Sequence, residues 1–138
     1  MQVEVEWHAI GPRSERLKWT RCLYAYTDLS ADEVVYIGKA DVKTVSQRFH
    51  APDKDALFDF LEREHGITQV GISVGDILAD EGTRLTRQLL ADIESLLIKR
   101  MQPIGNVTAK RSRIGRPGLV VVCSGDWPHQ RSRFRDAA

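Results

Sequence analysis

The sequence has little cysteine and no arrangement of histidines that suits a metal. Its two cysteines, Cys22 and Cys123, lie far apart and form no CxxC pair. Two are too few to make a disulfide framework in a chain of 138 residues, so we expect both to be reduced and buried. The four histidines lack an HxxxH or similar spacing, which leaves a zinc site without support.

A long apolar run is also missing. No stretch approaches the roughly 18 to 20 unbroken apolar residues of a membrane span, and the first residues, MQVEVEWHAIGPRSER, lack the basic-then-apolar layout of a signal peptide. We therefore expect a water-soluble, cytoplasmic protein with no membrane partner. A hydrophobic content of 42% is enough for one core, which predicts a single domain over residues 1–138.

The formal net charge of +1 hides an uneven distribution along the chain. Residues 1–105 hold 13 Lys and Arg against 17 Asp and Glu, whereas residues 106–138 hold 7 against 2. The basic C-terminal segment would suit sequence-independent phosphate contacts through Arg111, Arg113, Arg116, Arg131, Arg133 and Arg135. A solvated tail is the alternative. Trp127 and Phe134 are candidates for stacking on nucleic-acid bases.

Apolar periodicity predicts five strands and three helices. The expected strands, rich in β-branched and aromatic residues, are 2–8, 21–27, 33–38, 68–78 and 119–123. The expected helices are a short one from Val42 to before Pro52, one over 55–66 that ends at Gly66, and a long one over 83–101. Their connections are too short for repeated βαβ crossovers, which indicates an α+β fold with a mainly antiparallel sheet.

One residue on the long predicted helix does not fit a solvated position. Glu94 has Leu90 four positions before it and Leu97 three after it, which directs its carboxylate toward the protein body. A buried carboxylate needs a partner. An arginine in an ion pair is one possibility, and a hard divalent cation such as Mg²⁺ is another.

All three tyrosines of the chain fall in the predicted hairpin, which ends in Gly38-Lys39. Tyrosines from the two strands would lie close together, although the register is open at this point and aromatic strand residues are normally core. A free phenol has a pKa of about 10, so a tyrosine acts as a general base only where cations favour its ionised form.

The order of motifs along the chain resembles the GIY-YIG nuclease family. LYAY, VYIGKA, SQRFH and ADIESLLIKRMQPIGNV follow one another over about residues 22–107. The second signature tripeptide is intact as Tyr36-Ile37-Gly38, and the first is degraded to Cys22-Leu23-Tyr24. The specific feature is an ordered set with family-like spacing, namely Tyr24, Tyr36, Arg48, Glu94 and Asn106.

This resemblance implies a three-stranded antiparallel sheet flanked by helices, to which this chain would add N- and C-terminal strands. The catalytic core would cover residues 21–107, with an N-terminal extension over 1–20 and a basic C-terminal extension over 108–138. It further implies hydrolysis of DNA phosphodiesters assisted by one Mg²⁺ or Mn²⁺ ion. Glu94 would hold the metal, Tyr24 would deprotonate the attacking water, and Tyr36 would position that water or the phosphate.

The remaining matched residues would support this chemistry. Arg48 would bind the scissile phosphate through its permanently charged guanidinium, and Asn106 would brace the site. Lys39 would lower the pKa of a tyrosine, or else is an exposed surface lysine. Gly38 would let the backbone approach closely and, with Lys39, contact phosphate.

The chain departs from the family pattern in two places. Cys22 replaces the first glycine of the signature. Some relatives carry a histidine or tyrosine four positions beyond the helix arginine, where this chain has Pro52, and His50 stands two positions earlier. His50 is therefore either a substitute base or a helix-end residue favoured by the helix dipole.

Three functions follow as hypotheses. The first is a metal-dependent DNA endonuclease whose active site cuts one strand per encounter, with a homodimer or protein partner supplying double-strand cleavage or specificity. A non-catalytic nucleic-acid-binding module on the same fold is the second. The third is a structural domain in which Glu94 pairs with Arg48 and the tyrosines fill a core.

Overall fold

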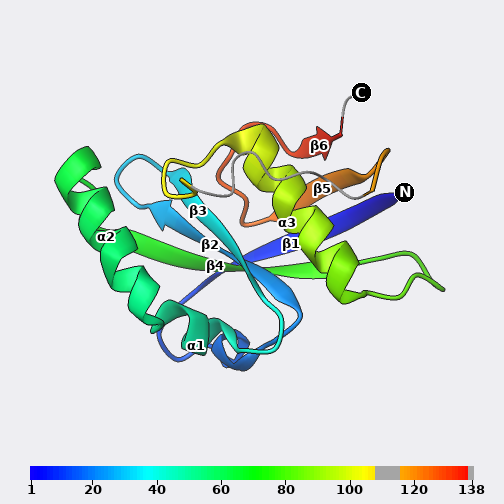
Figure 1. Cartoon of the computed structure of the whole chain (residues 1–138), viewed down its shortest axis with the longest axis horizontal. Coiled ribbons are helices and arrows are strands. Elements are labelled where there is room, and N and C mark those ends of the chain that lie inside the picture. Colours follow the sequence, from blue (N-terminus) through cyan, green and yellow to red (C-terminus); the bar gives the residue numbers. More distant parts are fainter. Residues whose placement is uncertain (108–115, 137–138) are drawn as a thin grey trace.

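The structure is a computed structural model that describes residues 1–107 and 116–136 (Figure 1). Its strands are β1 (Gln2–Ile10), β2 (Cys22–Asp28), β3 (Glu33–Ala40), β4 (Val70–Leu78), β5 (Val120–Gly125) and β6 (Arg133–Arg135). Its helices are η1 (Glu15–Lys18), a 3-10 turn, and the α-helices α1 (Val45–Phe49), α2 (Pro52–His65) and α3 (Arg87–Met101). This is an α+β fold, as the sequence predicts.

The strands form one six-stranded sheet in the order β3-β2-β4-β1-β5-β6. All neighbouring pairs are antiparallel except β1 and β5. The expected sheet of three strands is therefore wrong in size. The N-terminal strand β1 pairs with both β4 and β5, so it joins the C-terminal strands to the hairpin strands in a single sheet.

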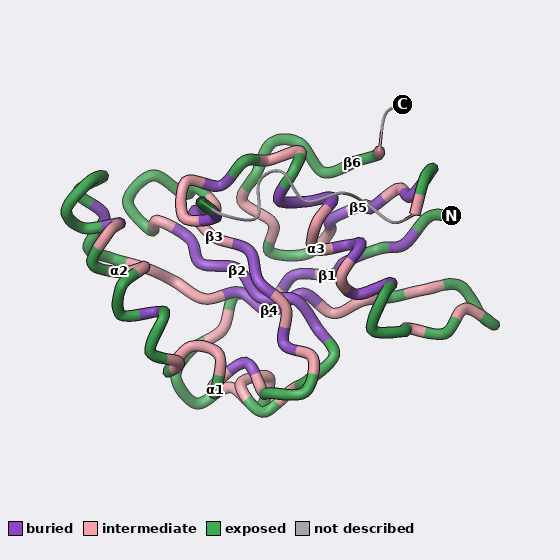
Figure 2. Tube along the Cα trace, in the orientation of Figure 1, coloured by how far each residue is buried: buried purple, intermediate pink, exposed green. Residues whose placement is uncertain are grey.

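Two faces of this sheet are covered differently. In β1, Val3, Val5 and Trp7 alternate with less buried residues and point into the core, as period-two patterning predicts. That core packs against α3, whose buried residues are mostly aliphatic: Leu89, Leu90, Ile93, Leu96, Leu97 and Ile98. Figure 2 shows the buried chain concentrated in the central strands and in α3.

The opposite face carries α1 and α2 (Figure 1). Its core contains Cys22, Tyr24 and Tyr26 from β2, with Leu61 from α2. Alternation along β2 explains the division, since Leu23 and Ala25 belong to the α3 side of the sheet. The hairpin thus contributes Leu23, Ala25 and Ile37 to one core and its tyrosines to the other.

Helix boundaries differ from the sequence expectation where capping residues intervene. Helix α1 begins at Val45 because Thr44 and Gln47 form a capping box, and Val42 is left 76% exposed in the preceding loop. Helix α2 begins at Pro52, whose fixed φ and missing N–H suit a first turn. Thr86 caps α3, so that helix is shorter than the predicted one.

Several smaller expectations are confirmed. Gly66 ends α2 in the left-handed region at φ 66°, a conformation that glycine adopts without strain. Cys22 and Cys123 are free and buried. In the part of the chain that the structure describes, no helix combines the length and the apolar character needed to cross a bilayer.

Candidate active site

The register of the hairpin brings the three tyrosines together. Tyr26 on β2 lies opposite Tyr36 on β3, and Tyr24 lies opposite Gly38. Because residues in register share a face of the sheet, all three rings point the same way. Ring centroids are 6.1 Å apart for Tyr24 and Tyr36 and 5.4 Å apart for Tyr26 and Tyr36. The predicted proximity of the tyrosines is therefore confirmed.

Gly38 leaves the space that the Tyr24 ring occupies. A Cβ atom built on Gly38 would collide with the ring and hydroxyl of Tyr24. The tyrosine ring therefore takes up the space that a side chain at position 38 would need, and contact of Gly38 with phosphate stays a prediction. Gly38 itself lines the cavity described below.

Arg48 reaches the tyrosines from α1. The capping box fixes the start of this short helix, with the Gln47 N–H donating to Thr44 Oγ1 at 3.1 Å and the Thr44 N–H donating to Gln47 Oε1 at 2.9 Å. Arg48 follows directly and stands beside the Tyr24 hydroxyl, and this contact is the main cause of its raised pKa. Its guanidinium thus places permanent positive charge at Tyr24.

Glu94 approaches the same place from α3. Its side chain is 19% exposed, and its carboxylate Oε1 lies 3.8 Å from Lys39 Nζ. Burial raises the pKa of Glu94, while the nearby charges of Lys39 and Arg48 oppose that rise. The expected inward direction of Glu94 is confirmed. The observed ion pair uses Lys39 and not Arg48, unlike the pairing in the structural-domain hypothesis.

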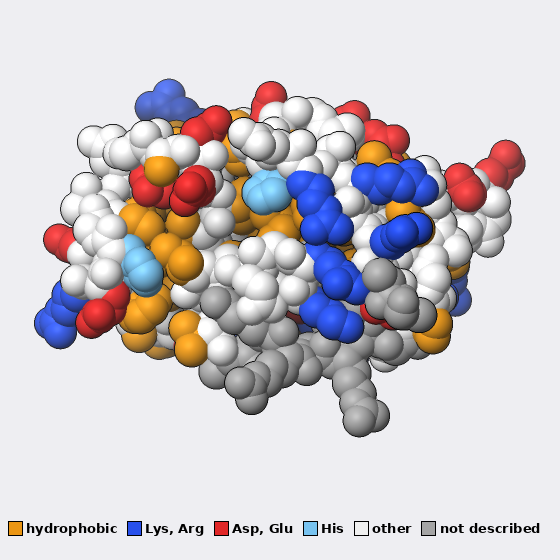
Figure 3. All heavy atoms as spheres, turned by 90° about the horizontal axis from the view of Figure 1, so that it is seen from above, with side chains coloured by type: hydrophobic (Ala, Val, Ile, Leu, Met, Phe, Trp, Pro, Cys, Tyr) orange, Lys and Arg blue, Asp and Glu red, His pale blue; other side chains and the backbone are white. Residues whose placement is uncertain are grey.

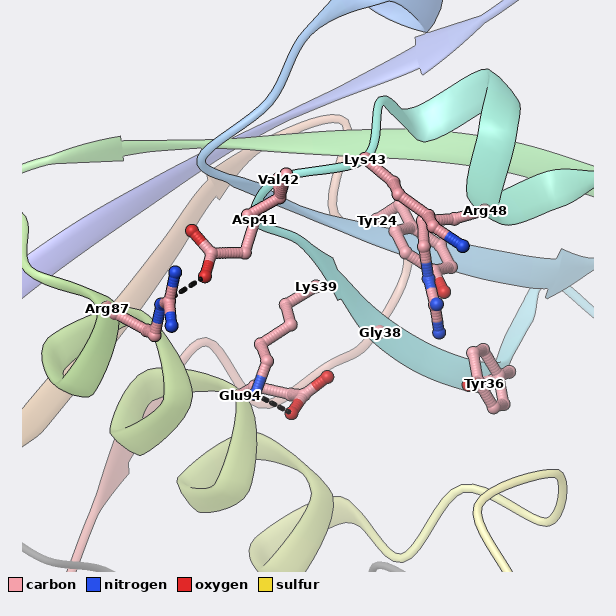
Figure 4. Close-up of a pocket in the computed structure, with 10 residues that line it drawn as sticks. All are labelled: Tyr24, Tyr36, Gly38, Lys39, Asp41, Val42, Lys43, Arg48, Arg87 and Glu94. Atoms are coloured by element: carbon pink, nitrogen blue, oxygen red, sulfur yellow. Dashed lines mark ion pairs between the residues drawn. The ribbon is translucent and has the colours of Figure 1, made fainter. Parts of the chain in front are cut away.

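These side chains line one cavity of about 520 Å³ at the outer strand β3. Figure 4 shows that Lys39 and Glu94 lie toward α3, whereas Tyr24 and Arg48 lie toward α1. The cavity therefore combines groups from both faces of the sheet. Such a site can form at an edge strand, because no further strand separates the two faces there. The residues that line the cavity are Tyr24, Tyr36, Gly38, Lys39, Asp41, Val42, Lys43, Arg48, Arg87 and Glu94.

Three charged residues of this lining are not matched by any motif in the sequence. Asp41 and Lys43 belong to the loop after β3, and Arg87 is the first residue of α3. Arg87 Nε lies 3.0 Å from Asp41 Oδ2, and Arg87 is mostly exposed. The sequence could have indicated Asp41 and Lys43, because the chain between Lys39 and Arg48 must pass beside any site that holds both of those residues.

The outer edge of β3 is held by Asn106. Its side chain accepts a hydrogen bond from the Ile37 N–H at 2.9 Å and donates one to the Ile37 carbonyl at 2.8 Å. A buried amide thus replaces the strand that an edge lacks, between Tyr36 and Gly38. These two hydrogen bonds are how Asn106 supports the strand that carries Tyr36 and Gly38.

The tyrosine hydroxyls differ in their surroundings. Burial raises the pKa of Tyr36, and the neighbouring Tyr24 hydroxyl raises it further, so Tyr36 stays a neutral phenol whose hydroxyl proton is available to a hydrogen-bond acceptor. Burial likewise raises the pKa of Tyr26. The Tyr24 hydroxyl is buried and makes no hydrogen bond of full geometric quality within the described chain, although Arg48 stands beside it.

His50 is not brought to this site. It caps the C-terminal end of α1, where its Nδ1 lies 2.9 Å from the Ser46 carbonyl oxygen. It lines a separate, mostly apolar cavity beside Leu17 and Phe49. This placement favours the helix-end role over a role as substitute base.

The basic C-terminal residues divide between described and undescribed parts of the chain. Arg111 and Arg113 lie outside the described residues. Arg116 Nε lies 3.4 Å from Asp92 Oδ2, and Arg131, Arg133 and Arg135 are exposed in and just before β6. Figure 3 shows Lys and Arg side chains gathered on the face that lies uppermost in Figure 1, the side of β6.

The two aromatic residues near β6 are structural. Phe134 is fully buried, so it has no ring face free to stack on a base. Trp127 stacks on Trp7 with ring centroids 5.1 Å apart, and its Nε1 donates to the Arg131 carbonyl at 2.9 Å. The expectation of base stacking is therefore wrong for Phe134 and unsupported for Trp127.

A metal would have to be held here by few protein ligands. No group of three His, Cys, Asp or Glu side chains suited to an ion occurs within residues 1–107 and 116–136. Mg²⁺ is commonly held by one or two carboxylates, with waters and substrate phosphates completing its shell. Glu94, a partly exposed carboxylate that lines the cavity, fits that mode of binding.

Comparison with known proteins gives no match: no family model matches the sequence, and no curated protein and no solved structure matches the chain. The features that point to a function are the order of the motifs and the geometry of the cavity.

Proposed function

We propose that this chain is a metal-dependent endonuclease of the GIY-YIG type, which hydrolyses phosphodiester bonds in DNA. One observation carries the proposal. Tyr24, Tyr36, Lys39, Arg48 and Glu94, which are spread over 71 positions of sequence, line a single cavity. Together these residues offer a candidate base, positive charge for an anionic ester and a candidate metal ligand.

The cavity supports a division of work among its residues. Arg48 binds the scissile phosphate, since a guanidinium donates several hydrogen bonds while keeping its charge. Tyr24 takes a proton from the attacking water, supported by the charge of Arg48 beside its hydroxyl. Tyr36, which burial keeps neutral, orients the water or a phosphate oxygen by donating its hydroxyl proton in a hydrogen bond.

Glu94 is the residue that would hold Mg²⁺ or Mn²⁺. When bound, the ion supplies Lewis-acid stabilisation of the charge that develops on the phosphate and on the leaving 3′ oxygen. Lys39 holds the Glu94 carboxylate in the cavity through their ion pair. Asn106 keeps β3 straight between Tyr36 and Gly38, which fixes the wall that carries both residues.

One cavity of this kind acts on one phosphodiester at a time, so the expected product is a nick. Double-strand cleavage then requires a homodimer or rebinding, and a protein partner is a further source of sequence specificity. The exposed arginines of the β6 region provide salt-sensitive backbone contacts that carry no sequence information.

Those same arginines favour one alternative, a nucleic-acid-binding module without catalysis. Both proposals predict DNA binding that weakens with added salt. Only the nuclease predicts that substitutions in the cavity stop a chemical step while leaving binding in place.

A plasmid assay separates the two. Supercoiled DNA is incubated with the protein and Mg²⁺ or Mn²⁺, and nicked circles are measured over time. We expect nicking by the native chain, none in chelator, and none by Glu94→Ala. Glu64→Ala is the matched control, since Glu64 is an exposed carboxylate on α2 away from the cavity.

The outcomes are distinct. Nicking by Glu64→Ala at the native rate, with none by Glu94→Ala, supports the nuclease. Salt-sensitive binding of the plasmid with no nicking in either metal would replace the nuclease with the binding module.

A further inference from the structure

The structure buries one lysine almost completely. Lys54 on α2 is 1% exposed, although lysine normally keeps its ammonium in water even when its stem is covered. No sequence motif singles this residue out. A buried charge requires compensation, and the compensation at Lys54 is modest.

Its ion-pair partner is a weak one. Lys54 Nζ lies 3.1 Å from Asp53 Oδ2, but the Asp53 side chain is 63% exposed and therefore well solvated on its own. The position of Lys54 in the first turn of α2 adds a second cost, because the N-terminal end of a helix repels positive charge. Two features of the fold therefore disfavour the charge of this ammonium: its burial beside a solvated partner and its place at the N-terminal end of a helix.

The ammonium instead faces the tyrosine pair of the candidate active site. Lys54 Nζ lies 5.1 Å from the ring centroid of Tyr36 and 5.8 Å from that of Tyr24. Both distances fall within the roughly 6 Å over which a cation attracts an aromatic face. Tyr24 and Tyr36 both line the cavity, whereas Lys54 lies behind them and outside its lining.

The charge of Lys54 is also felt by the groups around it. It lowers the pKa of Asp53 through their hydrogen bond, and it is among the cations that oppose the burial-driven rise in the pKa of Glu94. The charged or titratable groups that share this environment are Tyr24 and Tyr26 on β2, Tyr36 on β3, Arg48 on α1, Asp53 on α2 and Glu94 on α3.

We propose that Lys54 is a positioning residue of the nuclease site: its buried ammonium fixes the faces of Tyr24 and Tyr36 and supplies positive charge beside the cavity in which the phosphodiester binds. This inference rests on the proposed function. Lys54 does not touch the substrate, so its loss slows the chemical step and leaves DNA binding nearly unchanged.

The test compares Lys54→Met with the native chain in steady-state plasmid or oligonucleotide cleavage. Methionine keeps the length of the side chain and removes the charge. We expect kcat to fall by about tenfold or more, because the transition state places more negative charge near Lys54 than the bound substrate does, and KM to change by less than about threefold. The pH at which the rate is half maximal should move upward, because negative charge near the tyrosines then costs more.

A stability measurement distinguishes this role from a structural one. Replacing Lys54 removes the cost of burying an ammonium, which offsets the loss of its contacts with the solvated Asp53 and the two tyrosine rings, so Lys54→Met should melt at the same temperature as the native chain or higher. Arg63→Met on the same helix is the matched control, since it removes one positive charge from an exposed site and should leave kcat unchanged. Lys54→Arg should recover part of the lost kcat.

Two results would overturn the inference. One is a Lys54→Met protein whose kcat and pH profile match the native chain within about twofold. The other is a protein that melts earlier and regains native kcat when assayed well below its melting temperature. Either result leaves an active native nuclease intact, whereas a native chain that cleaves no DNA in any divalent metal removes the proposed function, and this inference with it.

Discussion

The two faces of the sheet follow different rules. The α3 face buries mostly aliphatic side chains, with Leu96 and Ile93 fully covered, and it brings Lys39 and Glu94 to the cavity at the edge strand β3. The α1 and α2 face buries Tyr24, Tyr26 and Lys54, and the hydroxyls of both tyrosines lack a partner of full hydrogen-bond quality within the described chain. Both faces supply groups to the cavity, but the core under α3 is mostly aliphatic, whereas the core under α1 and α2 contains buried polar groups beside the cavity.

The largest expected effect is that of replacing Arg48, which lies on the face covered by α1 and α2. Arg48→Met should reduce the cleavage rate by about 100-fold or more, the range seen when a preorganised charge-stabilising donor is removed. The melting temperature of Arg48→Met should change little, because the residue is only half-buried and its Nε makes no hydrogen bond within the described chain. Single-turnover cleavage measures this, with Arg63→Met as the control. A loss of equal size in both variants would contradict a specific role for Arg48.

On the α3 face, a substitution in the core should change the free energy of unfolding by an amount similar to the change in activation free energy expected for Arg48→Met. Leu96→Ala removes a fully buried side chain and should lower the free energy of unfolding by about 2 to 5 kcal/mol. Urea unfolding followed by circular dichroism measures the change. Cleavage per folded molecule should stay near the native value, and a specific loss of turnover would show that the two faces are coupled.

Gly38→Ala tests the edge strand β3, beside which groups from the two faces meet in the cavity. The added Cβ would meet the Tyr24 ring, and overpacking of this kind costs about 1 to 3 kcal/mol. We also expect slower cleavage, since Tyr24 must shift. Gly11→Ala is the matched control, because a Cβ there meets nothing within 4 Å. Equal melting temperatures for the two variants would rule out the close contact.

The smallest effect is expected at Tyr26, which is buried beside the site but does not line the cavity. Tyr26→Phe removes a hydroxyl without a hydrogen-bond partner in the described part of the chain and keeps the ring. Stability should rise slightly or stay within about 1 kcal/mol of native. Thermal unfolding and cleavage rates test this, and a fall of several degrees would mean that the hydroxyl is satisfied in solution.

Much of this arrangement could be predicted from the sequence. Period-two patterning found β1, and the tyrosine-rich runs found the hairpin, because local apolar spacing is read directly from the chain. The motif order also selected Tyr24, Tyr36, Lys39, Arg48 and Glu94, all of which line the cavity.

The rest depended on long-range packing. The position of β1 between β4 and β5 joins residues more than 60 positions apart, and no local pattern determines it. Lys54 was missed because a charged residue on an amphipathic helix reads as solvated. Arg87 and Asp41 were missed because their pairing requires α3 to pass the loop after β3.

The most direct test of the central claim is single-turnover cleavage of a duplex labelled on one strand, in Mg²⁺, by Glu94→Gln and Glu64→Gln. Both variants remove one negative charge, but only Glu94 lines the cavity. The account predicts that Glu94→Gln loses about 100-fold or more in rate while melting no earlier than the native chain, and that Glu64→Gln cleaves normally. Equal rates for the two variants would contradict the assignment of this cavity as the active site.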